Sequence, residues 1–370
     1  MMEAKEGLRT VVGLMSGTSM DGIDAALLRT DGRDRVEALD FLTIPYDDGF
    51  RTRLRGCLGK SDVSGGPVAE VERDLTDAHA DAVHRVLDKA GVAAAEVELI
   101  GFHGHTIHHD PDRRLTCQIG DGARLAAATG IAVVNDLRSA DVAAGGQGAP
   151  LVPLFHRALV HGLPRPLAVL NIGGVANVSW IGSDPQEGEA DVVACDTGPG
   201  NALIDDWVLR HGLGRFDAGG ALAAAGQVDD AALAVLMAHP YFGRPAPKSL
   251  DRDAFDPAPV AALSPQDGAA TLTAFTAESV ASVVPHLPAP PMRWLVCGGG
   301  RHNATLMAML ADRLGVPVQP ADTVGWDGDA LEAQAFGYLA VRSRLGLPLS
   351  LPATTGVPVP MPGGVFHPAG

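Results

Sequence analysis

The chain has 370 residues, of which 46% are hydrophobic and 19% charged, a composition typical of a folded enzyme with two lobes. Its formal net charge of −16 repels nucleic acid and anionic lipid, so we expect neither nucleic acid nor a membrane among its partners. No apolar stretch approaches the ~20 residues that cross a bilayer, the chain does not start with an apolar leader, and its cysteines form no Cys-x-x-Cys pair. These features predict a cytoplasmic protein without a zinc site.

The first segment of the chain predicts a β-hairpin with a turn of small polar residues. Residues 10–15 and 23–28 are largely apolar, and residues 16–22 (SGTSMDG) between them are mostly turn formers. Such a turn lets backbone N–H groups approach a phosphate, and Asp21 and Asp24 could hold water on a Mg²⁺ ion that bridges phosphates. An ordinary hairpin with a polar turn is the alternative, and only the particular run SGTSMDG favours a phosphate site over it.

The order of predicted elements occurs twice along the chain. In the first half the hairpin is followed by a helix at residues 76–90 and a strand at residues 97–102, which runs into a Gly-containing turn. In the second half a hairpin with the turn NIGGVA (residues 171–176) precedes a helix at residues 272–284 and a strand at residues 294–297. We interpret this order as a duplication; two unrelated α/β lobes built from common βα units are the alternative.

The expected domain organisation places the boundary at the Gly-containing segment that starts near residue 141. Lobe I then comprises residues 1–140 and carries the phosphate hairpin, and lobe II comprises residues 141–349. The tail of about residues 350–370 is rich in Pro and Gly, so we expect it to pack back on lobe I as an extended segment.

Two segments of the second half carry candidate chemistry. A short apolar strand ends at Asp196 beside a Gly-rich turn, which suits a general base facing a cleft as well as a carboxylate bound by turn N–H groups. Gly298, Gly299 and Gly300 follow a strand and allow a flat ligand to lie against the backbone, and Asn303 is the expected N-cap of the next helix. This arrangement favours a nucleoside pocket over a simple strand-to-helix turn. The sequence has neither a P-loop nor a complete dinucleotide fingerprint, so any ATP would be held by hairpin turns.

Further polar groups occur in three places. Arg138 precedes a Gly-rich run and could make a bidentate contact to a carboxylate, although a solvated linker is the alternative. Asp329 and Glu332 have the spacing of a helix capping box, which by spacing alone is the preferred explanation of Glu332. His103 and His105 belong to a crowded group of histidines without ligands at a diagnostic metal spacing, so sugar contacts or core packing are expected there.

Taken together, these runs resemble the anhydro-N-acetylmuramic acid kinase family. The matching stretches follow the order of the family and span almost the whole chain: GLMSGTSMDGID (residues 13–24), GFHGHTIHHDP (101–111), residues 135–153, NIGGVANV (171–178), DTGPGN (196–201), CGGGRHN (297–303) and DALEAQAFG (329–337). The resemblance implies the two-lobed, actin-like α/β fold, a duplicated ribonuclease H-like architecture with an active-site cleft between the lobes. It also implies a homodimer.

The resemblance implies a reaction in which water opens the 1,6-anhydro ring of 1,6-anhydro-N-acetylmuramic acid while ATP phosphorylates O6. The product is N-acetylmuramic acid 6-phosphate, formed in peptidoglycan recycling, and Mg²⁺ would bridge the phosphates. Asp196 matches the catalytic base, Glu332 matches an active-site glutamate, which reverses the preference for a simple cap, and Arg138 matches a residue that contacts the substrate and could meet its lactyl carboxylate. The residues assigned to ATP are Gly17, Thr18, Ser19, Met20, Asp21, Gly22, Ile23, Asp24, Asn171, Gly173, Gly174, Gly298, Gly299, Gly300 and Asn303. The residues assigned to the substrate are His103, His105, Arg138, Gly146, Gln147, Thr197, Gly198 and Asn201.

Two departures from the family pattern concern the substrate. His105 stands where the family usually has Gln, and KSLDRD at residues 248–253 replaces the usual KSTGRE. A kinase for another anhydrosugar such as levoglucosan, or an ordinary sugar kinase, is therefore the alternative function. A non-catalytic ATP-switched binding protein is a third hypothesis, which would leave Glu332 and Arg138 without a role.

Overall fold

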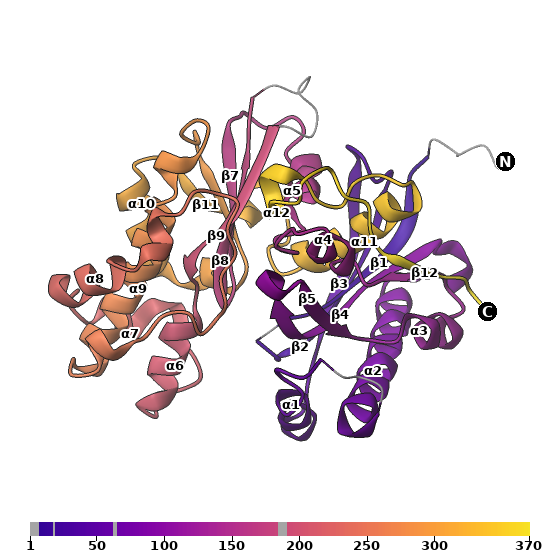
Figure 1. The fold of residues 1–370 in the computed structure, drawn as a ribbon, viewed down its shortest axis with the longest axis horizontal. Helices are drawn as coiled ribbons and strands as arrows, with labels where there is room; N and C mark the ends of the chain where they lie inside the picture. Colours follow the sequence, from indigo (N-terminus) through magenta and orange to yellow (C-terminus); the bar gives the residue numbers. More distant parts are fainter. Residues whose placement is uncertain (1–6, 18, 62–64, 184–190) are drawn as a thin grey trace. The chain divides into compact units, whose positions relative to one another are not determined.

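The protein divides into two compact units in the computed structural model, which describes residues 7–17, 19–61, 65–183 and 191–370 (Figure 1). The first unit consists of Met1–Gly162 with Ala330–Gly370, and the second of Leu163–Asp329. Thr18, which the sequence assigns to the phosphate turn, lies outside the described residues.

The first unit is built on a seven-stranded sheet in the order β12-β6-β4-β1-β2-β3, with β5 paired to β4. Strands β1, β2 and β3 form an antiparallel meander, and β4 and β6 run parallel to β1. The strands are β1 (Arg9–Ser16), β2 (Gly22–Thr30), β3 (Val36–Pro45), β4 (Leu99–Asp110), β5 (Leu115–Ile119), β6 (Val133–Asn135) and β12 (Val365–His367). The helices are α1 (Asp48–Arg55), α2 (Gly66–Ala90), α3 (Gly122–Thr129), α4 (Ser139–Ala143), α5 (Pro153–Leu159), α11 (Leu331–Arg344) and α12 (Pro352–Thr355), with 3₁₀ turns η1 (Ala94–Glu96) and η2 (Pro111–Arg113).

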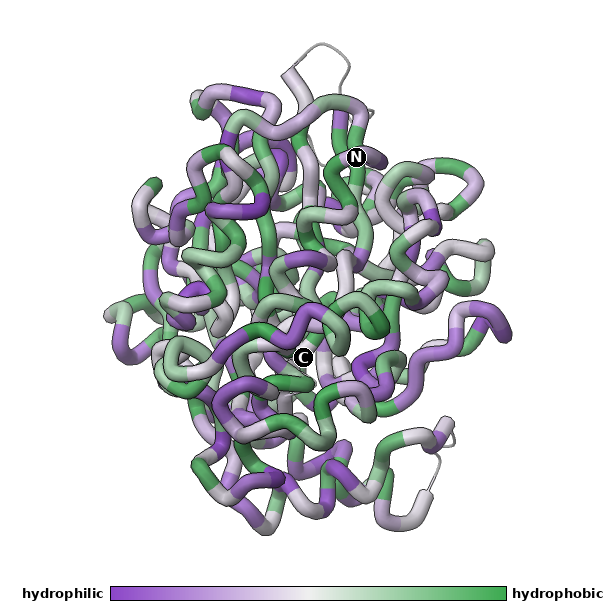
Figure 2. The backbone as a smooth tube through the Cα atoms, turned by 90° about the vertical axis from the view of Figure 1, so that its left-hand side faces the viewer, coloured by the Kyte–Doolittle hydropathy of each residue, from purple (hydrophilic) through white to green (hydrophobic). Residues whose placement is uncertain are grey.

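Helices cover both faces of this sheet because alternate residues of its strands point to opposite sides. On β1, Val12 and Leu14 belong to the same apolar core as the inner face of α2. On the other face a Cβ at Gly13 or Gly101 would overlap with the backbone of α11, so these glycines let α11 lie directly on β1 and β4. Figure 2 colours the backbone by hydropathy, and hydrophobic and hydrophilic residues follow one another at short intervals along the chain.

The second unit is built on a five-stranded sheet in the order β11-β10-β7-β8-β9. Its strands are β7 (Leu167–Ile172), β8 (Val175–Ile181), β9 (Val192–Pro199), β10 (Trp294–Cys297) and β11 (Val318–Pro320). Its helices are α6 (Ala202–Arg210), α7 (Ala221–Ala224), α8 (Asp230–Met237), α9 (Pro265–Ala281) and α10 (Ala304–Leu314). Its 3₁₀ turns are η4 (Ala218–Gly220), η5 (Pro240–Gly243), η6 (Ala258–Val260), η7 (Val284–His286), η8 (Gly299–His302) and η9 (Ala321–Val324).

The two sheets share one topology. In each, an antiparallel meander of three strands is followed by two strands parallel to the first, so that β3-β2-β1-β4-β6 corresponds to β9-β8-β7-β10-β11. This strand order confirms the predicted α/β fold, in which a ribonuclease H-like unit occurs twice.

The observed units differ from the expected boundary at residues 140/141 in two places. Helices α4 and α5 lie in the first unit, and α11 also lies there because it packs against β1, β2 and β4. The tail lies in the first unit too, where β12 pairs with β6. The turn expected at His103 is instead part of β4, which continues to Asp110 with Gly104 at φ 72°. Among the described residues, no helix is long and apolar enough to span a membrane.

Candidate active site

The turn between β1 and β2, where the sequence predicts a phosphate site, is held by groups from outside it. Met20 adopts φ 55°, which is uncommon for a residue other than Gly, and Arg51 Nε donates to its carbonyl oxygen at 2.9 Å. The backbone N–H of Tyr46 donates to Asp21 O at 2.9 Å. A Cβ at Gly22 would overlap with the backbone of Ile44, so the end of the turn lies close against β3.

A buried hydrogen-bond chain fixes the start of the same turn. Tyr46 Oη donates to Ser16 Oγ at 2.8 Å, and Ser16 Oγ lies 3.0 Å from Nδ1 of His105. Burial lowers the pKa of His105 to about 4, so its ring is neutral at neutral pH. His105 therefore contacts the phosphate turn through Ser16, and its assignment to the substrate stays a prediction.

The two carboxylates proposed for Mg²⁺ are partly engaged by hydroxyls. Ser19 Oγ donates to Asp21 at 2.8 Å, and Thr43 Oγ1 donates to Asp24 at 2.6 Å. Within the part of the chain that the structure describes, no group of three or more His, Cys, Asp or Glu residues could hold a metal ion. These residues fit only an ion that is held mainly by phosphate oxygens and water.

Arg138 lies at the N-terminus of α4 and is oriented by three neighbours. Its Nε donates to His103 Nε2 at 2.9 Å, its Nη1 donates to Gly148 O at 2.7 Å, and its guanidinium lies 5.9 Å from the ring centroid of Phe336. Burial and then the charge of Arg138 lower the pKa of His103 well below its ordinary value, so His103 is neutral and accepts this bond. The structure thus brings together His103, Arg138 and the Gly-rich run.

Glu332 is on α11, and its environment connects it to two other predicted site residues. Burial raises the pKa of its carboxyl, the Arg138 guanidinium opposes this rise, and the Asp21 carboxylate adds to it. Phe336, one turn after Glu332 on α11, lies 5.9 Å from the Arg138 guanidinium, so Arg138 lies against the helix that carries Glu332. The capping-box explanation is wrong, because the N-cap of α11 is Ala330 and Arg301 binds the Asp329 carboxylate.

In the second unit, Asp196 is on β9 and is enclosed by the segment from Tyr241 to Leu250. Its Oδ2 accepts from Leu250 N at 2.8 Å, and its own N–H donates to Lys248 O at 2.9 Å. Lys248 is buried with Nζ 4.4 Å from the Tyr241 ring centroid, and burial lowers its pKa. Asp196 itself is 7% exposed, so only a small part of its surface can meet a ligand.

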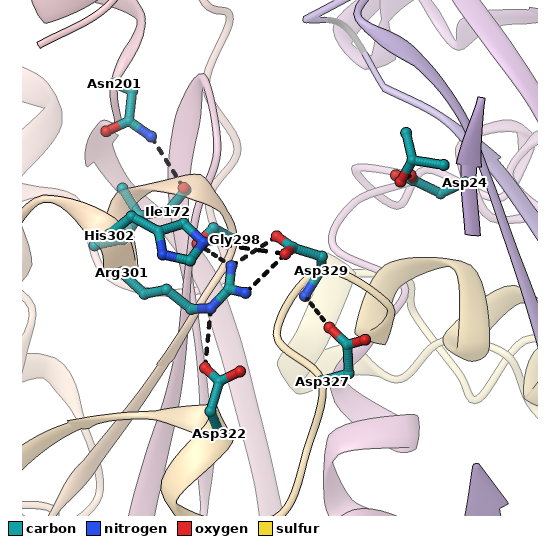
Figure 3. Close-up of polar contacts among 10 residues, drawn as sticks. Asp24, Ile172, Asn201, Gly298, Arg301, His302, Asp322, Asp327 and Asp329 are labelled. Carbon is teal, nitrogen blue, oxygen red and sulfur yellow. Dashed lines mark hydrogen bonds and ion pairs between the residues drawn. The ribbon is translucent and has the colours of Figure 1, made fainter. Parts of the chain in front are cut away.

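The glycines of the second unit that are assigned to ATP lie in two neighbouring turns. Gly298 adopts φ 73°, and any side chain there would overlap with Asn171 and Ile172, so the turn at residues 298–300 lies on the β7–β8 hairpin. Asn201 donates from Nδ2 to Ile172 O at 3.1 Å (Figure 3). The same Nδ2 donates to Gly173 O at 3.2 Å. Asn201, which was assigned to the substrate, thus braces the same hairpin turn as Asn171, Gly173 and Gly174.

Three other assigned residues have structural contacts in the same unit. Thr197 is buried and donates to Ala176 O at 3.2 Å, and a Cβ at Gly198 would overlap with Ser279. Asn303 is the predicted N-cap of α10 and accepts from Leu306 N at 2.9 Å. Their roles in binding substrate or ATP stay predictions.

Arg301 is a residue of this region to which the sequence gives no role. Its side chain is 4% exposed, and it donates to Asp329 from Nη1 at 2.7 Å and from Nη2 at 2.8 Å (Figure 3). It also donates to Asp322 at 3.0 Å and to Gly298 O at 3.1 Å. Arg301 therefore joins the glycine turn to the last residue of the unit. Its position directly after the glycines was the one available signal.

Comparison with known proteins identifies the family. The sequence profile of the anhydro-N-acetylmuramic acid kinases matches residues 9–369. The anhydro-N-acetylmuramic acid kinase of Rhodospirillum rubrum is 58% identical over 100% of this chain and 96% of its own length, and that of Rhizorhabdus wittichii is 54% identical over 96% and 98%. Component A of the (R)-2-hydroxyglutaryl-CoA dehydratase of Acidaminococcus fermentans covers 91% of this chain and 99% of its own with 13% identity and a TM-score of 0.48, which is too weak to decide the fold. The sequence matches over the full length show that this chain belongs to the anhydro-N-acetylmuramic acid kinase family.

Proposed function

We propose that the protein opens the ring of 1,6-anhydro-N-acetylmuramic acid with water and transfers the γ-phosphoryl group of ATP to O6. The observation that carries this proposal is the packing of α11, the helix of Glu332, on β1, which leads into the phosphate turn, and the contact of the Arg138 guanidinium with Phe336 of the same helix at 5.9 Å. The first unit thereby carries a carboxyl group, a guanidinium and the phosphate turn on elements that pack against one another. Family membership over residues 9–369 supports the same substrate.

The chemistry requires a base for water because the anhydro substrate has no 6-hydroxyl proton to remove. Asp196 takes a proton from water as the water oxygen bonds to the anomeric carbon. The bond from that carbon to O6 breaks, O6 bonds to the γ-phosphorus, and the bond from this phosphorus to the bridging oxygen of ADP breaks. Phosphoryl transfer depends mostly on positioning and charge neutralisation, which the remaining site residues supply.

Arg138 binds the lactyl carboxylate of the substrate in this proposal. A guanidinium offers parallel N–H donors that match a carboxylate, and His103 and Gly148 O restrict its orientation. Burial raises the pKa of the Glu332 carboxyl, and in this proposal the carboxyl forms a hydrogen bond with a sugar hydroxyl.

ATP occupies two turns in this proposal. The turn at residues 17–22 receives phosphates through its backbone N–H groups, and the glycines at residues 298–300 receive the nucleoside. Asp21 and Asp24 would hold Mg²⁺ through water, and this ion would neutralise phosphate charge. A cytoplasmic location follows from the use of ATP, and a homodimer remains a family expectation.

A kinase for levoglucosan, or for a sugar with a free hydroxyl, is the alternative that the departures at His105 and residues 248–253 leave open. Release of ADP is measured with 1,6-anhydro-N-acetylmuramic acid, levoglucosan and N-acetylmuramic acid. The proposal expects turnover with the first and little with the other two.

Turnover in water enriched in heavy oxygen tests the hydrolytic step. The proposal expects label at the anomeric carbon when the product is analysed before the anomeric hydroxyl exchanges. A kinase for a sugar with a free hydroxyl would introduce no label during turnover. Absence of label would therefore contradict the proposed hydrolytic reaction.

A further inference from the structure

Asp141 is a buried carboxylate that connects three separate segments of the first unit. It lies on α4 and is 2% exposed. Its Oδ1 accepts from Gly148 N at 2.6 Å, and its Oδ2 accepts from Thr355 Oγ1 at 2.6 Å and from Ser350 Oγ. Two of its donors therefore come from the C-terminal tail, more than two hundred residues away along the chain.

The same contacts shape the Gly-rich run after α4. A Cβ at Gly146 would overlap with the Asp141 carboxylate, so the backbone passes directly over this group. Gly146 N also donates to Asp141 O at 2.9 Å, and Gln147 N donates to Thr355 O at 2.6 Å. The run is thus held between α4 and the tail.

The fixed run in turn contacts Arg138, because Arg138 Nη1 donates to Gly148 O at 2.7 Å. Gly148 uses its N–H for Asp141 and its carbonyl for Arg138. A continuous path of hydrogen bonds therefore leads from Ser350 and Thr355 through Asp141 and Gly148 to the guanidinium.

We propose that Asp141, Ser350 and Thr355 are positioning residues that hold Arg138 in the orientation that receives the carboxylate of the substrate. The proposal rests on the function proposed above for Arg138. It makes the C-terminal tail a contributor to substrate specificity, although neither Ser350 nor Thr355 is assigned to the substrate.

The chemistry of the cluster argues for positioning rather than for simple charge pairing. Among the described residues, no Lys, Arg or His forms an ion pair with Asp141 within 4.0 Å. A carboxylate only accepts hydrogen bonds, and here it accepts two from hydroxyls and one from the backbone. Removing the hydroxyls leaves a buried charge with fewer donors, and the Gly-rich run loses a fixed neighbour.

The test compares Thr355→Val, Ser350→Ala and the double variant with the wild-type chain. KM for 1,6-anhydro-N-acetylmuramic acid and KM for ATP are each measured from ADP release. The loss of hydrogen bonds to a charged group predicts a KM for the sugar about tenfold higher in the double variant, with KM for ATP unchanged within about twofold. Thr355→Ser keeps the hydroxyl and should restore wild-type values.

Ser343→Ala is the matched control, because Ser343 Oγ on α11 donates to Gly363 O in the same tail and has no hydrogen bond with Asp141. It should leave both KM values unchanged while altering thermal stability to a similar degree. Equal rises in both KM values, or the same change in Ser343→Ala, would show a merely structural role and overturn the proposal. If the double variant does not fold, the single variants test the proposal, and each should raise KM for the sugar about threefold. Wild-type turnover fails only if the proposed function itself is wrong, so the two failures are distinguishable.

Discussion

Arg301 binds Asp329 through two parallel hydrogen bonds, and the same guanidinium donates to the carbonyl oxygen of Gly298. Asp329 is therefore not the N-cap of α11 that the sequence suggests. Its carboxylate instead binds Arg301, which contacts the glycine turn at Gly298. The pair joins the strand-to-helix turn after β10 to the end of the second unit.

Replacing Arg301 with Lys should raise KM for ATP several-fold and lower stability by about 1–3 kcal/mol, because an ammonium cannot reproduce the two-pronged contact. Arg124→Lys is the control, since Arg124 makes a similar contact with Asp77 on the surface of the first unit. Because that pair is exposed to solvent, it should contribute little to stability. KM values from ADP release and thermal unfolding measure both effects, and similar results for the two variants would contradict a role for Arg301 in the glycine turn.

The contribution of Arg301 to stability should depend on pH through the protonation of Asp329. The hydrogen bonds from Arg301 lower the pKa of the Asp329 carboxyl below its ordinary value of 3.8. Because the pKa of Asp329 is lower in the folded chain than in the unfolded chain, its contribution to stability is fully present above the unfolded pKa of 3.8. This contribution is lost as the pH falls through the pKa of the folded chain. Denaturant unfolding of wild type and Arg301→Met should therefore differ at pH 6 and converge towards pH 3. A difference that persists unchanged at pH 3 would assign the stabilisation to packing instead.

Tyr46→Phe should raise KM for ATP about threefold to tenfold, because it removes the donor to Ser16 Oγ at the start of the phosphate turn. Tyr338→Phe is a matched control, since the buried Tyr338 hydroxyl donates to Arg33 O instead. Both variants should lose about 1 kcal/mol of stability. Only Tyr46→Phe should change the kinetics with ATP, as measured by ADP release at varied nucleotide concentration.

Stability should fall as the pH drops from about 6.5 towards 4, because several histidines are buried in the neutral form. Burial lowers the pKa of His79 and His105 to about 4 and that of His156 to about 3. The unfolded chain takes up these protons below its ordinary pKa of 6.5, whereas the folded chain does not, so folding is weakened across that window. His156→Gln should flatten the slope in denaturant titrations at successive pH values, and an unchanged slope would contradict the burial of His156.

Local patterns in the sequence predicted the parts of the site that depend on neighbours in the chain. The turns at residues 16–22 and 171–176 and the Asn303 cap follow from turn and cap residues whose partners are close in sequence. The capping box at Asp329 failed because a distant side chain, Arg301, competes for the same carboxylate.

Long-range contacts account for the rest of what the sequence did not predict. The tail contacts of Asp141 and the docking of α11 on the first sheet depend on residues that only the folded chain brings together. The continuation of β4 past His103 depends on Gly104, which adopts a positive φ and lies against the backbone of Ile119 on β5. None of these contacts has a local signature.

The glycines at positions 13 and 101 have a consequence for how finely the reaction geometry can vary. They place the backbone of α11 against the backbones of β1 and β4, with no side chain between them that could adjust by changing rotamer. Strand β1 leads directly into the phosphate turn, and α11 carries Glu332. The distance between Glu332 and the phosphate turn is therefore set by backbone packing. Directed evolution of new substrate preferences should succeed through substitutions in loops and leave the contact of α11 with β1 and β4 unchanged.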